Sequence, residues 1–162
     1  MARFVLVLPL HELAIGDAFP VADWPLHVTL VEPFPTELAT GAIAALVGTA
    51  LGDASAVTAT AGARAGFGRR GDVPVTLVGD DDGALAAMRR RVLDALREAD
   101  VDVARARLDY RPHVTAMPHG EVEPGTTVRL EQVALIDMQP ADGAGMRAVA
   151  AVWPLSRVDP DG

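Results

Sequence analysis

Two histidines of this chain occur in the same tripeptide, His-Val-Thr, once in "HVTLV" at residues 27–31 and once in "HVTAM" at residues 113–117. The first motif lies in a run of β-branched and aliphatic residues, which predicts a strand, and the second repeats its pattern. In a strand, residues i and i+2 point to the same face about 6.6 Å apart, at a rise of roughly 3.3 Å per residue. We therefore expect His27 beside Thr29 and His113 beside Thr115, with the intervening valines in the core.

If both strands face one groove, they bring together two imidazoles and two hydroxyls, with no carboxylate or thiol among them. Imidazole has an unperturbed pKa of about 6.5, so near neutral pH one ring can accept a proton while the other donates one. The hydroxyls of Thr29 and Thr115 can bind the non-bridging oxygens of a phosphate. This set of groups suits acid–base cleavage of a phosphate ester, and it requires no metal ion or other cofactor.

Simpler interpretations of the same residues stay open. His27 and His113 could be two separate strand histidines that hydrogen-bond to the backbone, and threonine is common in strands without any role in binding. Two strand histidines could also bind zinc, which usually takes three or four protein ligands, but the sequence places no third ligand beside them. The remaining histidines, His11 and His119, are expected at the surface or at the rim of the groove.

Two single arginines are candidates for binding the substrate. Arg111 precedes His113 by two residues, so strand alternation puts it on the same face, where it could pair with a phosphate oxygen or form a salt bridge at the rim. Arg64 lies on one side of a predicted strand and is the second candidate. The run of arginines at residues 89–91 has acidic residues nearby, and we expect it to form a solvated helix face.

Two aromatic residues stand just before the motifs: Trp24 is three residues before His27, and Tyr110 is three residues before His113. Each could stack on a base, because every base presents a flat face that an aromatic ring can cover. Packing beneath the groove is the alternative for both. The same two possibilities hold for Phe67, at the end of a predicted strand.

The composition sets the class of protein. The chain has 162 residues, 50% of them hydrophobic, which fits one globular domain; we expect it to span residues 1–155, followed by a flexible tail at 156–162. There is no cysteine, so disulfides, thiolate catalysis and Cys-ligated metal sites are excluded. The apolar run at residues 4–10 is too short to span a bilayer and makes a poor secretory signal, which favours a cytoplasmic protein.

The formal net charge is −8, and all fourteen basic residues are arginine. An acidic surface argues against binding long duplex DNA or RNA, because that affinity comes mostly from many contacts to phosphates. We expect a small nucleotide or an RNA end as the substrate, no duplex DNA partner, no membrane partner and a monomeric protein.

Strands and two helices would position these residues. Strands are expected at residues 3–10, 26–31, 57–67, 73–79, 112–117, 127–138 and 146–153. A helix capped by Thr36 and a second helix started by the aspartates at 80–82 each carry one apolar face. Residues 11–24 have no clean period and are expected to form a mobile connection. Together these elements predict an α+β fold, with helices on the outer faces of largely antiparallel sheet.

The expected elements form two similar halves, each with one amphipathic helix and one His-Val-Thr strand. With "HVTLV" and "HVTAM" separated by 86 residues (113 − 27), this arrangement resembles the two-histidine (2H) phosphoesterases, which include 2′-5′ RNA ligase-like and cyclic nucleotide phosphodiesterase proteins. The resemblance covers most of residues 3–153. It implies a bilobal α+β protein with pseudo-twofold symmetry and a central cleft that holds both motifs.

The resemblance also implies an activity. Many members open 2′,3′-cyclic phosphates to 2′-phosphates, and some reversibly join RNA ends through 2′-5′ bonds. By this likeness His27 would be the general acid, His113 the base that activates water, and Thr29 and Thr115 the phosphate ligands. We therefore expect a metal-independent cyclic phosphodiesterase acting on nucleotides or RNA ends. The alternatives are a phosphate- or nucleotide-binding module without turnover and a reversible 2′-5′ RNA end-joining enzyme.

Overall fold

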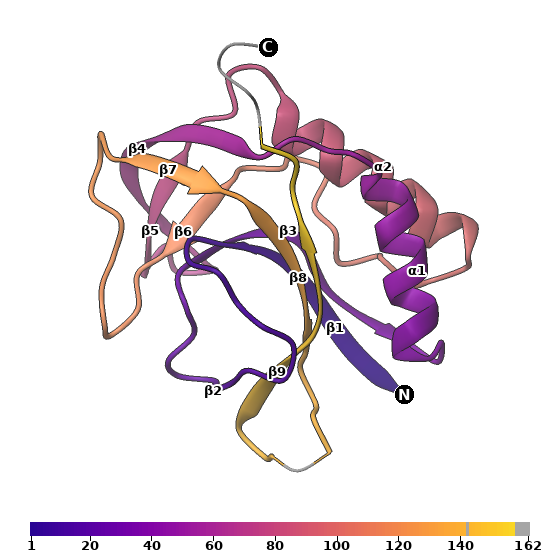
Figure 1. Ribbon diagram of the computed structural model, residues 1–162. Helices are drawn as coiled ribbons and strands as arrows, with labels where there is room; N and C mark the ends of the chain where they lie inside the picture. The colour runs from indigo at the N-terminus through magenta and orange to yellow at the C-terminus, as the bar shows by residue number, and fades with distance from the viewer. Residues whose placement is uncertain (142, 158–162) are drawn as a thin grey trace.

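The computed structural model describes residues 1–141 and 143–157, and within them nine strands form one curled sheet whose strand pairings are all antiparallel (Figure 1). The strand order is β2-β9-β8-β1-β3-β6-β5-β4-β7. The strands are β1 (Ala2–Pro9), β2 (Ala18–Pro20), β3 (His27–Thr36), β4 (Val57–Phe67), β5 (Val73–Val78), β6 (His113–Thr115), β7 (Thr127–Leu130), β8 (Gln132–Asp137) and β9 (Met146–Pro154). With the helices α1 (Thr40–Leu51) and α2 (Ala84–Glu98), this confirms the predicted α+β class.

The two His-Val-Thr strands are neighbours near the middle of the sheet. β3 and β6 pair with Val28 opposite Val114, so the antiparallel register sets each motif histidine opposite the threonine of the other motif. Both valines are buried in the main core. Because side chains alternate along a strand, the histidines and threonines of both motifs project from the opposite face. The fold thus brings two motifs that are 86 residues apart (113 − 27) onto one surface.

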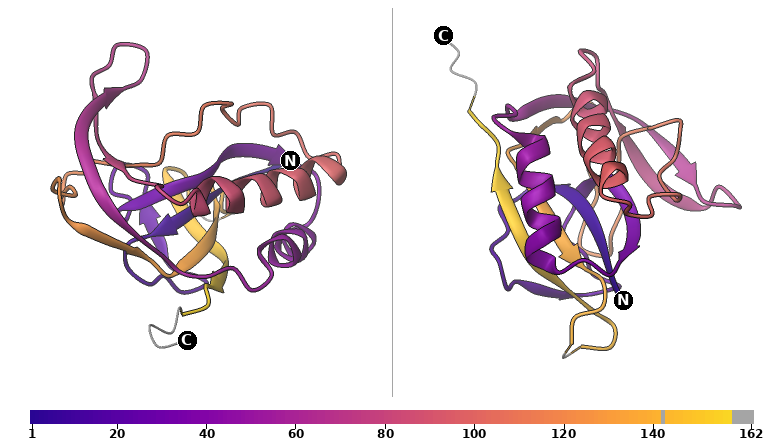
Figure 2. Two further views of the ribbon diagram at one scale, coloured as in Figure 1. Left: turned by 90° about the horizontal axis from the view of Figure 1, so that it is seen from above. Right: turned by 90° about the vertical axis from the view of Figure 1, so that its right-hand side faces the viewer.

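Both helices lie on the core side of the sheet (Figure 2). Ile43 and Val47 of α1 and Leu85 and Val92 of α2 pack in one cluster with Val28, and the two helices contact each other. Neither helix of the described residues is long and apolar enough to cross a membrane. The expectation that the helices cover the outer faces of two halves is not confirmed in detail, because here they lie side by side over one shared core.

The aspartates that were predicted to start the second helix do so. The Asp80 carboxylate accepts hydrogen bonds from the backbone N–H groups of Leu85 (2.9 Å) and Ala86 (3.0 Å), and Asp82 accepts one from Ala84 (3.1 Å). These bonds satisfy donors that have no partner within the helix, and negative charge there also opposes the positive end of the helix dipole.

The prediction that Thr36 caps the first helix is wrong. β3 continues through two prolines to Thr36, which is buried, and α1 begins only at Thr40. Beyond Val28, β3 has β1 as its only strand partner within the described residues, and a strand with one free edge tolerates proline. The strand therefore continues through the prolines, five residues beyond the end at residue 31 that was predicted (36 − 31).

The segment at residues 11–24 is more ordered than expected. Within it, β2 pairs with β9, and Phe19 is buried. The Gln132 side chain fixes the start of the segment: its amide oxygen accepts from the Leu13 N–H (3.0 Å), and its amide nitrogen donates to the Leu13 carbonyl (2.8 Å). Residues 11–24 lack a clear sequence period because their strand, β2, is short and lies at the edge of the sheet, and not because the segment is a free connection.

The predicted strand at 127–138 divides at Glu131 into β7 and β8. β7 pairs with β4, and β8 pairs with β1 and β9, so the two ends of one continuous segment belong to distant parts of the sheet. The sheet must curl for this to be possible. Near the C-terminus, Ser156 pairs with Ser55, while residues 158–162 of the predicted flexible tail lie outside the described residues.

Candidate active site

The imidazoles of His27 and His113 are held in the same way. In each ring Nδ1 bonds to the backbone carbonyl two residues earlier: His27 to Pro25 over 2.7 Å, and His113 to Arg111 over 2.8 Å. A carbonyl oxygen only accepts hydrogen bonds, so Nδ1 carries a hydrogen in both rings. The atom left to accept or donate a proton is therefore Nε2 in each histidine.

Each imidazole also packs against an aromatic ring. The ring centroids of His113 and Phe67 lie 4.4 Å apart, and those of His27 and Trp24 lie 5.1 Å apart. Together with the Nδ1 hydrogen bonds, these contacts restrict rotation of the two imidazoles. The sequence left two roles open for Trp24, stacking on a base or packing beneath the groove; the side chain is half-buried between His27 and Phe19, whose ring lies 5.3 Å away.

The surroundings of the two histidines differ because the segment that carries β2 folds over one of them. Phe19 and Trp24 from this segment pack with Val5 and Val7, which lie on the face of β1 that points away from the main core. This is also the face from which the motif side chains project. The result is an apolar wall beside His27.

The pKa of His27 reflects this wall. Burial lowers the pKa, the hydrogen bond to the Pro25 carbonyl acts against the lowering, and the charge of His113 lowers it further. The free protein therefore favours the neutral, proton-accepting form of His27 near neutral pH. The influence of His113 also means that the two rings are close enough to interact electrostatically.

A pocket of about 440 Å³ opens beside His113, the histidine that the apolar wall does not cover. Its volume is within the range of roughly 300–1,000 Å³ that is usual for small-molecule sites. Thr29 lines it, whereas Thr115 and His27 do not. The lining residues are Thr29, Glu32, Pro33, Gly66, Phe67, Gly68, Arg107, Asp109, Tyr110, Arg111 and His113.

The β4–β5 hairpin supplies the Phe67 wall of this pocket, and glycines shape its tip. Gly68 and Gly71 have φ angles of +86° and +65°, in the left-handed region that favours glycine. A Cβ atom on Gly66 would collide with the carbonyl oxygen of Gly71. The close turn at this tip places Phe67 against His113.

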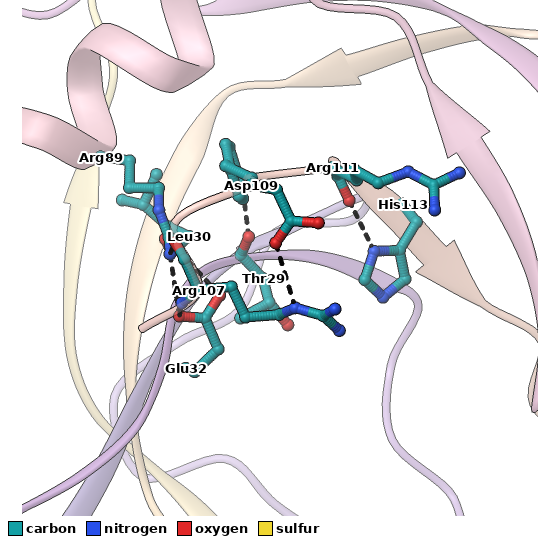
Figure 3. A network of polar contacts seen from close by, with 9 residues as sticks. Thr29, Leu30, Glu32, Arg89, Arg107, Asp109, Arg111 and His113 are labelled. Carbon is teal, nitrogen blue, oxygen red and sulfur yellow. Dashed lines mark hydrogen bonds and ion pairs between the residues drawn. The ribbon is translucent and has the colours of Figure 1, made fainter. Parts of the chain in front are cut away.

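A buried arginine, Arg89, holds two residues of the pocket lining, Glu32 and Arg107 (Figure 3). Arg89 of α2 donates to both carboxylate oxygens of Glu32, over 2.8 and 3.0 Å. It also donates to the backbone carbonyls of Leu30 (2.7 Å) and Arg107 (2.8 Å). The prediction of a solvated face at residues 89–91 is wrong for Arg89, which is only 4% exposed. This side chain ties α2 to β3 and to the loop that precedes the second motif.

Tyr110 belongs to the same network. Its hydroxyl donates to the Thr29 carbonyl over 2.8 Å, and the guanidinium of Arg89 lies 4.4 Å from the centre of its ring. Burial raises the pKa of Tyr110, an effect that the charge of Arg89 opposes, so the phenol stays protonated and can donate. Tyr110 lines the pocket as predicted for a substrate contact, but Arg89 already covers its ring.

The structure does not bring every candidate to the pocket. Arg64 is exposed and pairs with Glu121 (3.2 Å) and Glu123 (2.6 Å), outside the pocket lining. His119 is exposed, as expected of a surface or rim residue, and its Nε2 bonds to the Trp24 carbonyl over 2.7 Å. Among the described residues, no three side chains of His, Asp and Glu are grouped so that they could hold a metal ion.

Arg111 does line the pocket, with its guanidinium 4.9 Å from the centre of the Phe67 ring. Four other charged residues of the site were missed by the sequence analysis: Glu32, Arg89, Arg107 and Asp109, the last of which lines the pocket beside Arg107. Glu32 and Arg107 line the pocket, and Arg89 joins them from below. Of these residues, only Arg89 could have been predicted from the sequence, because its spacing from the buried residues of α2 puts it on the core face of that helix.

Comparison with known proteins agrees with this arrangement. The fold is similar to the crystal structure of a phosphoesterase, with 17% identity, a TM-score of 0.62 and coverage of 96% of this chain and 99% of that one. It is also similar to E. coli LigT in complex with 3′-AMP (17% identity, TM-score 0.62, coverage 95% and 98%). The protein TT0787 of Thermus thermophilus is a further match (16% identity, TM-score 0.62, coverage 96% and 98%). At such identities these likenesses establish the fold.

The family is established by sequence. No curated protein matches the chain at a significant level. A family model described as the 2′-5′ RNA ligase superfamily matches residues 12–133, a range that includes both His-Val-Thr motifs and leaves out β1, most of β8 and β9. The resemblance to two-histidine phosphoesterases is thereby confirmed. This chain belongs to the 2′-5′ RNA ligase superfamily.

Proposed function

We propose that this protein is a metal-independent phosphodiesterase that hydrolyses 2′,3′-cyclic phosphates of nucleotides or RNA ends. One observation carries the proposal: two imidazoles with matching Nδ1 hydrogen bonds project from adjacent strands, each opposite the threonine of the other motif, and a pocket of ligand size opens beside one of them, His113. Paired imidazoles supply a base and an acid, each of which typically contributes about 10²–10⁴-fold.

The reaction uses one Nε2 atom for each proton. A neutral imidazole takes a proton from water as the water oxygen attacks phosphorus. The bond from phosphorus to one ribose oxygen breaks, and that oxygen takes a proton from the other imidazole, which leaves a phosphomonoester. The hydroxyls of Thr29 and Thr115 bind the non-bridging oxygens. Proton exchange with solvent then restores both rings.

The roles of His27 and His113 follow from their surroundings in this proposal. The resemblance implied that His27 is the acid, but its lowered pKa favours the neutral form, which is the form that a base needs. His113 lines the pocket in which a nucleoside would lie, and the departing oxygen belongs to the ribose. We therefore assign His27 as the base and His113 as the acid.

The direct test is incubation with a panel of the four nucleoside 2′,3′-cyclic phosphates and 2′-5′-linked dinucleotides in buffer containing EDTA. We expect conversion of the cyclic phosphates to monophosphates, followed by ³¹P NMR, which also identifies the oxygen that leaves. Absence of product from all four, or product only after a divalent metal is added, would contradict the proposal. Faster turnover of the dinucleotides would favour end-joining chemistry instead.

A plot of kcat/KM against pH should be bell-shaped. Activity falls at low pH as the base, His27, gains a proton, and because the pKa of His27 is lowered, this limb lies below the ordinary histidine value of about 6.5. Activity falls at high pH as the acid, His113, loses its proton. The two rings interact, so the two apparent pKa values belong to the pair.

NMR titration checks the cause of this shift. The charge of His113 lowers the pKa of His27, so His113→Gln should raise the pKa of His27. An unchanged His27 titration in that variant would mean that the rings do not interact.

A further inference from the structure

The pocket beside His113 carries two arginines that the hydrolytic step does not require. Arg107 and Arg111 both line it, next to Thr29 and His113. We infer that they form a subsite for a second phosphate group of the substrate, one nucleotide position away from the cyclic phosphate. This inference rests on the proposed function and narrows the substrate to a phosphorylated nucleotide or a short RNA end rather than a bare nucleoside cyclic phosphate.

The balance of charge in the pocket supports an anionic ligand. Two arginines, Arg107 and Arg111, line the pocket together with two carboxylates, Glu32 and Asp109. Glu32 is satisfied by Arg89. Counted together with the buried Arg89, these groups carry an excess of one positive charge (3 − 2) in a protein whose formal net charge is −8. Because Arg89 neutralises Glu32, a ligand with negative charge is favoured beside Arg107 and Arg111.

The guanidinium groups of both pocket arginines have donors left for a ligand. Asp109 lies 3.5 Å from Nε of Arg107, and this ion pair leaves the terminal nitrogens of Arg107 to other partners. Arg111 packs on the Phe67 ring and has no carboxylate within ion-pair distance among the described residues. Planar guanidinium groups bind phosphate oxygens with two parallel hydrogen bonds.

The backbone beneath these arginines is already fixed. The Arg107 carbonyl accepts from Arg89 over 2.8 Å, and the Arg107 N–H donates to Glu32 over 3.2 Å. The Arg111 carbonyl accepts from Nδ1 of His113 over 2.8 Å. A subsite whose frame is fixed before binding loses less entropy when the ligand arrives. The last of these bonds also links the subsite directly to a motif histidine.

The size of the pocket limits the ligand. A volume of about 440 Å³ accommodates one nucleotide unit rather than a long strand. The ligand chemistry is therefore a single phosphate next to the reacting nucleotide. It can be a terminal 5′-phosphate or the diester link of an RNA end.

Binding and turnover test this inference separately. Binding is measured by calorimetry with adenosine 2′-phosphate and adenosine 2′,5′-bisphosphate, and turnover with adenosine 2′,3′-cyclic phosphate, its 5′-phosphorylated form and a dinucleotide that ends in the cyclic phosphate. We expect the added phosphate to increase affinity and kcat/KM about tenfold or more, the size expected of a charge-assisted contact. R107A and R111A should each reduce that gain, and the double variant should remove it.

R90A is the matched control, because Arg90 is exposed on α2, lies outside this pocket, and its loss removes the same charge. The inference is overturned if the added phosphate gives no gain while hydrolysis persists, if the gain survives in the double variant, or if R90A removes it equally. A gain with the dinucleotide alone that survives in the double variant would also overturn it, because the second nucleoside rather than the linking phosphate would then be recognised. A phosphate-dependent gain in binding with no hydrolysis of any substrate supports the subsite and refutes the proposed function.

Discussion

Replacing either His27 or His113 by alanine should lower kcat/KM for a nucleoside 2′,3′-cyclic phosphate by about 10²–10⁴-fold, which is the contribution of one general acid or base. A thousandfold loss corresponds to about 4 kcal/mol of barrier. In the proposed mechanism Nε2 of each ring transfers one proton, because Nδ1 is held by a backbone carbonyl, so neither ring can compensate for loss of the other. The measurement is steady-state hydrolysis with product detection by chromatography.

Two controls separate loss of chemistry from loss of structure. His11→Ala removes an exposed histidine outside this pocket and should retain wild-type kcat/KM. Thermal unfolding of the variants should show that His113→Ala folds, since the ring lies at the pocket surface. His27 packs on Trp24, so His27→Gln, which keeps more of the side-chain volume, provides a second variant at that position. Wild-type rates in either histidine variant would refute the assignment.

The same variants distinguish the base from the acid. With His27 as the base, the residual activity of His27→Ala should lose the acidic limb of its pH profile. His113→Ala should lose the basic limb. The opposite pattern would restore the order that the resemblance implied, with His27 as the acid.

The placement of the motif side chains could be predicted from the sequence because the geometry that joins them is local. A strand places residues i and i+2 on one face, so His27 with Thr29, and His113 with Thr115, follow from spacing alone. The repeated motif suggested only that the two strands face one groove; the structure makes them neighbours, as the pairing of β3 with β6. The α+β class followed in the same way from alternation and helical periodicity.

Arg89 shows where local reasoning could have gone further. It is four residues after Leu85 and three before Val92, both of which are buried, so helical periodicity places it on the core face of α2. Its position within a run of three arginines hid this spacing. Its partner Glu32 is 57 residues away in the sequence, and no local pattern joins the two.

The pocket itself depends on contacts that sequence patterns do not encode. Its wall at Phe67 comes from the β4–β5 hairpin, while Arg107 and Arg111 come from an irregular loop. The difference between the two histidines arises because the segment with β2 folds over His27. That segment has no clear period, so its effect on the pKa of His27 could be found only from the three-dimensional structure.

Removing one partner of the Arg89–Glu32 ion pair should have the largest effect on stability. Arg89→Met is expected to lower the free energy of unfolding by about 3–5 kcal/mol, the usual cost of breaking a buried ion pair. The variant also leaves the Leu30 and Arg107 carbonyls without their Arg89 donor. Arg89→Lys should recover only part of the loss, because an ammonium cannot reproduce the forked contact with both Glu32 oxygens. Urea denaturation at neutral pH measures these differences.

The neighbouring residues provide the comparison that makes this result specific. Arg90→Ala, at the exposed position next to Arg89, should change the free energy of unfolding by no more than about 0.5 kcal/mol. Tyr110→Phe removes only the hydrogen bond to the Thr29 carbonyl and should cost about 1 kcal/mol. If the Arg89→Met variant proved as stable as the Arg90→Ala variant, the buried ion pair would not be what holds the loop against β3.

Because Arg89 fixes the Arg107 backbone without lining the pocket, it acts as a positioning residue, and its effect on catalysis should differ from that of the histidines. In Arg89→Lys, assayed well below its unfolding temperature, we expect KM to rise more than kcat falls, with both limbs of the pH profile kept. Misplacing Arg107 and Arg111 weakens binding, whereas the proton-transferring Nε2 atoms remain on β3 and β6. Loss of either pH limb in this variant would instead place Arg89 in direct contact with the chemistry of the histidines.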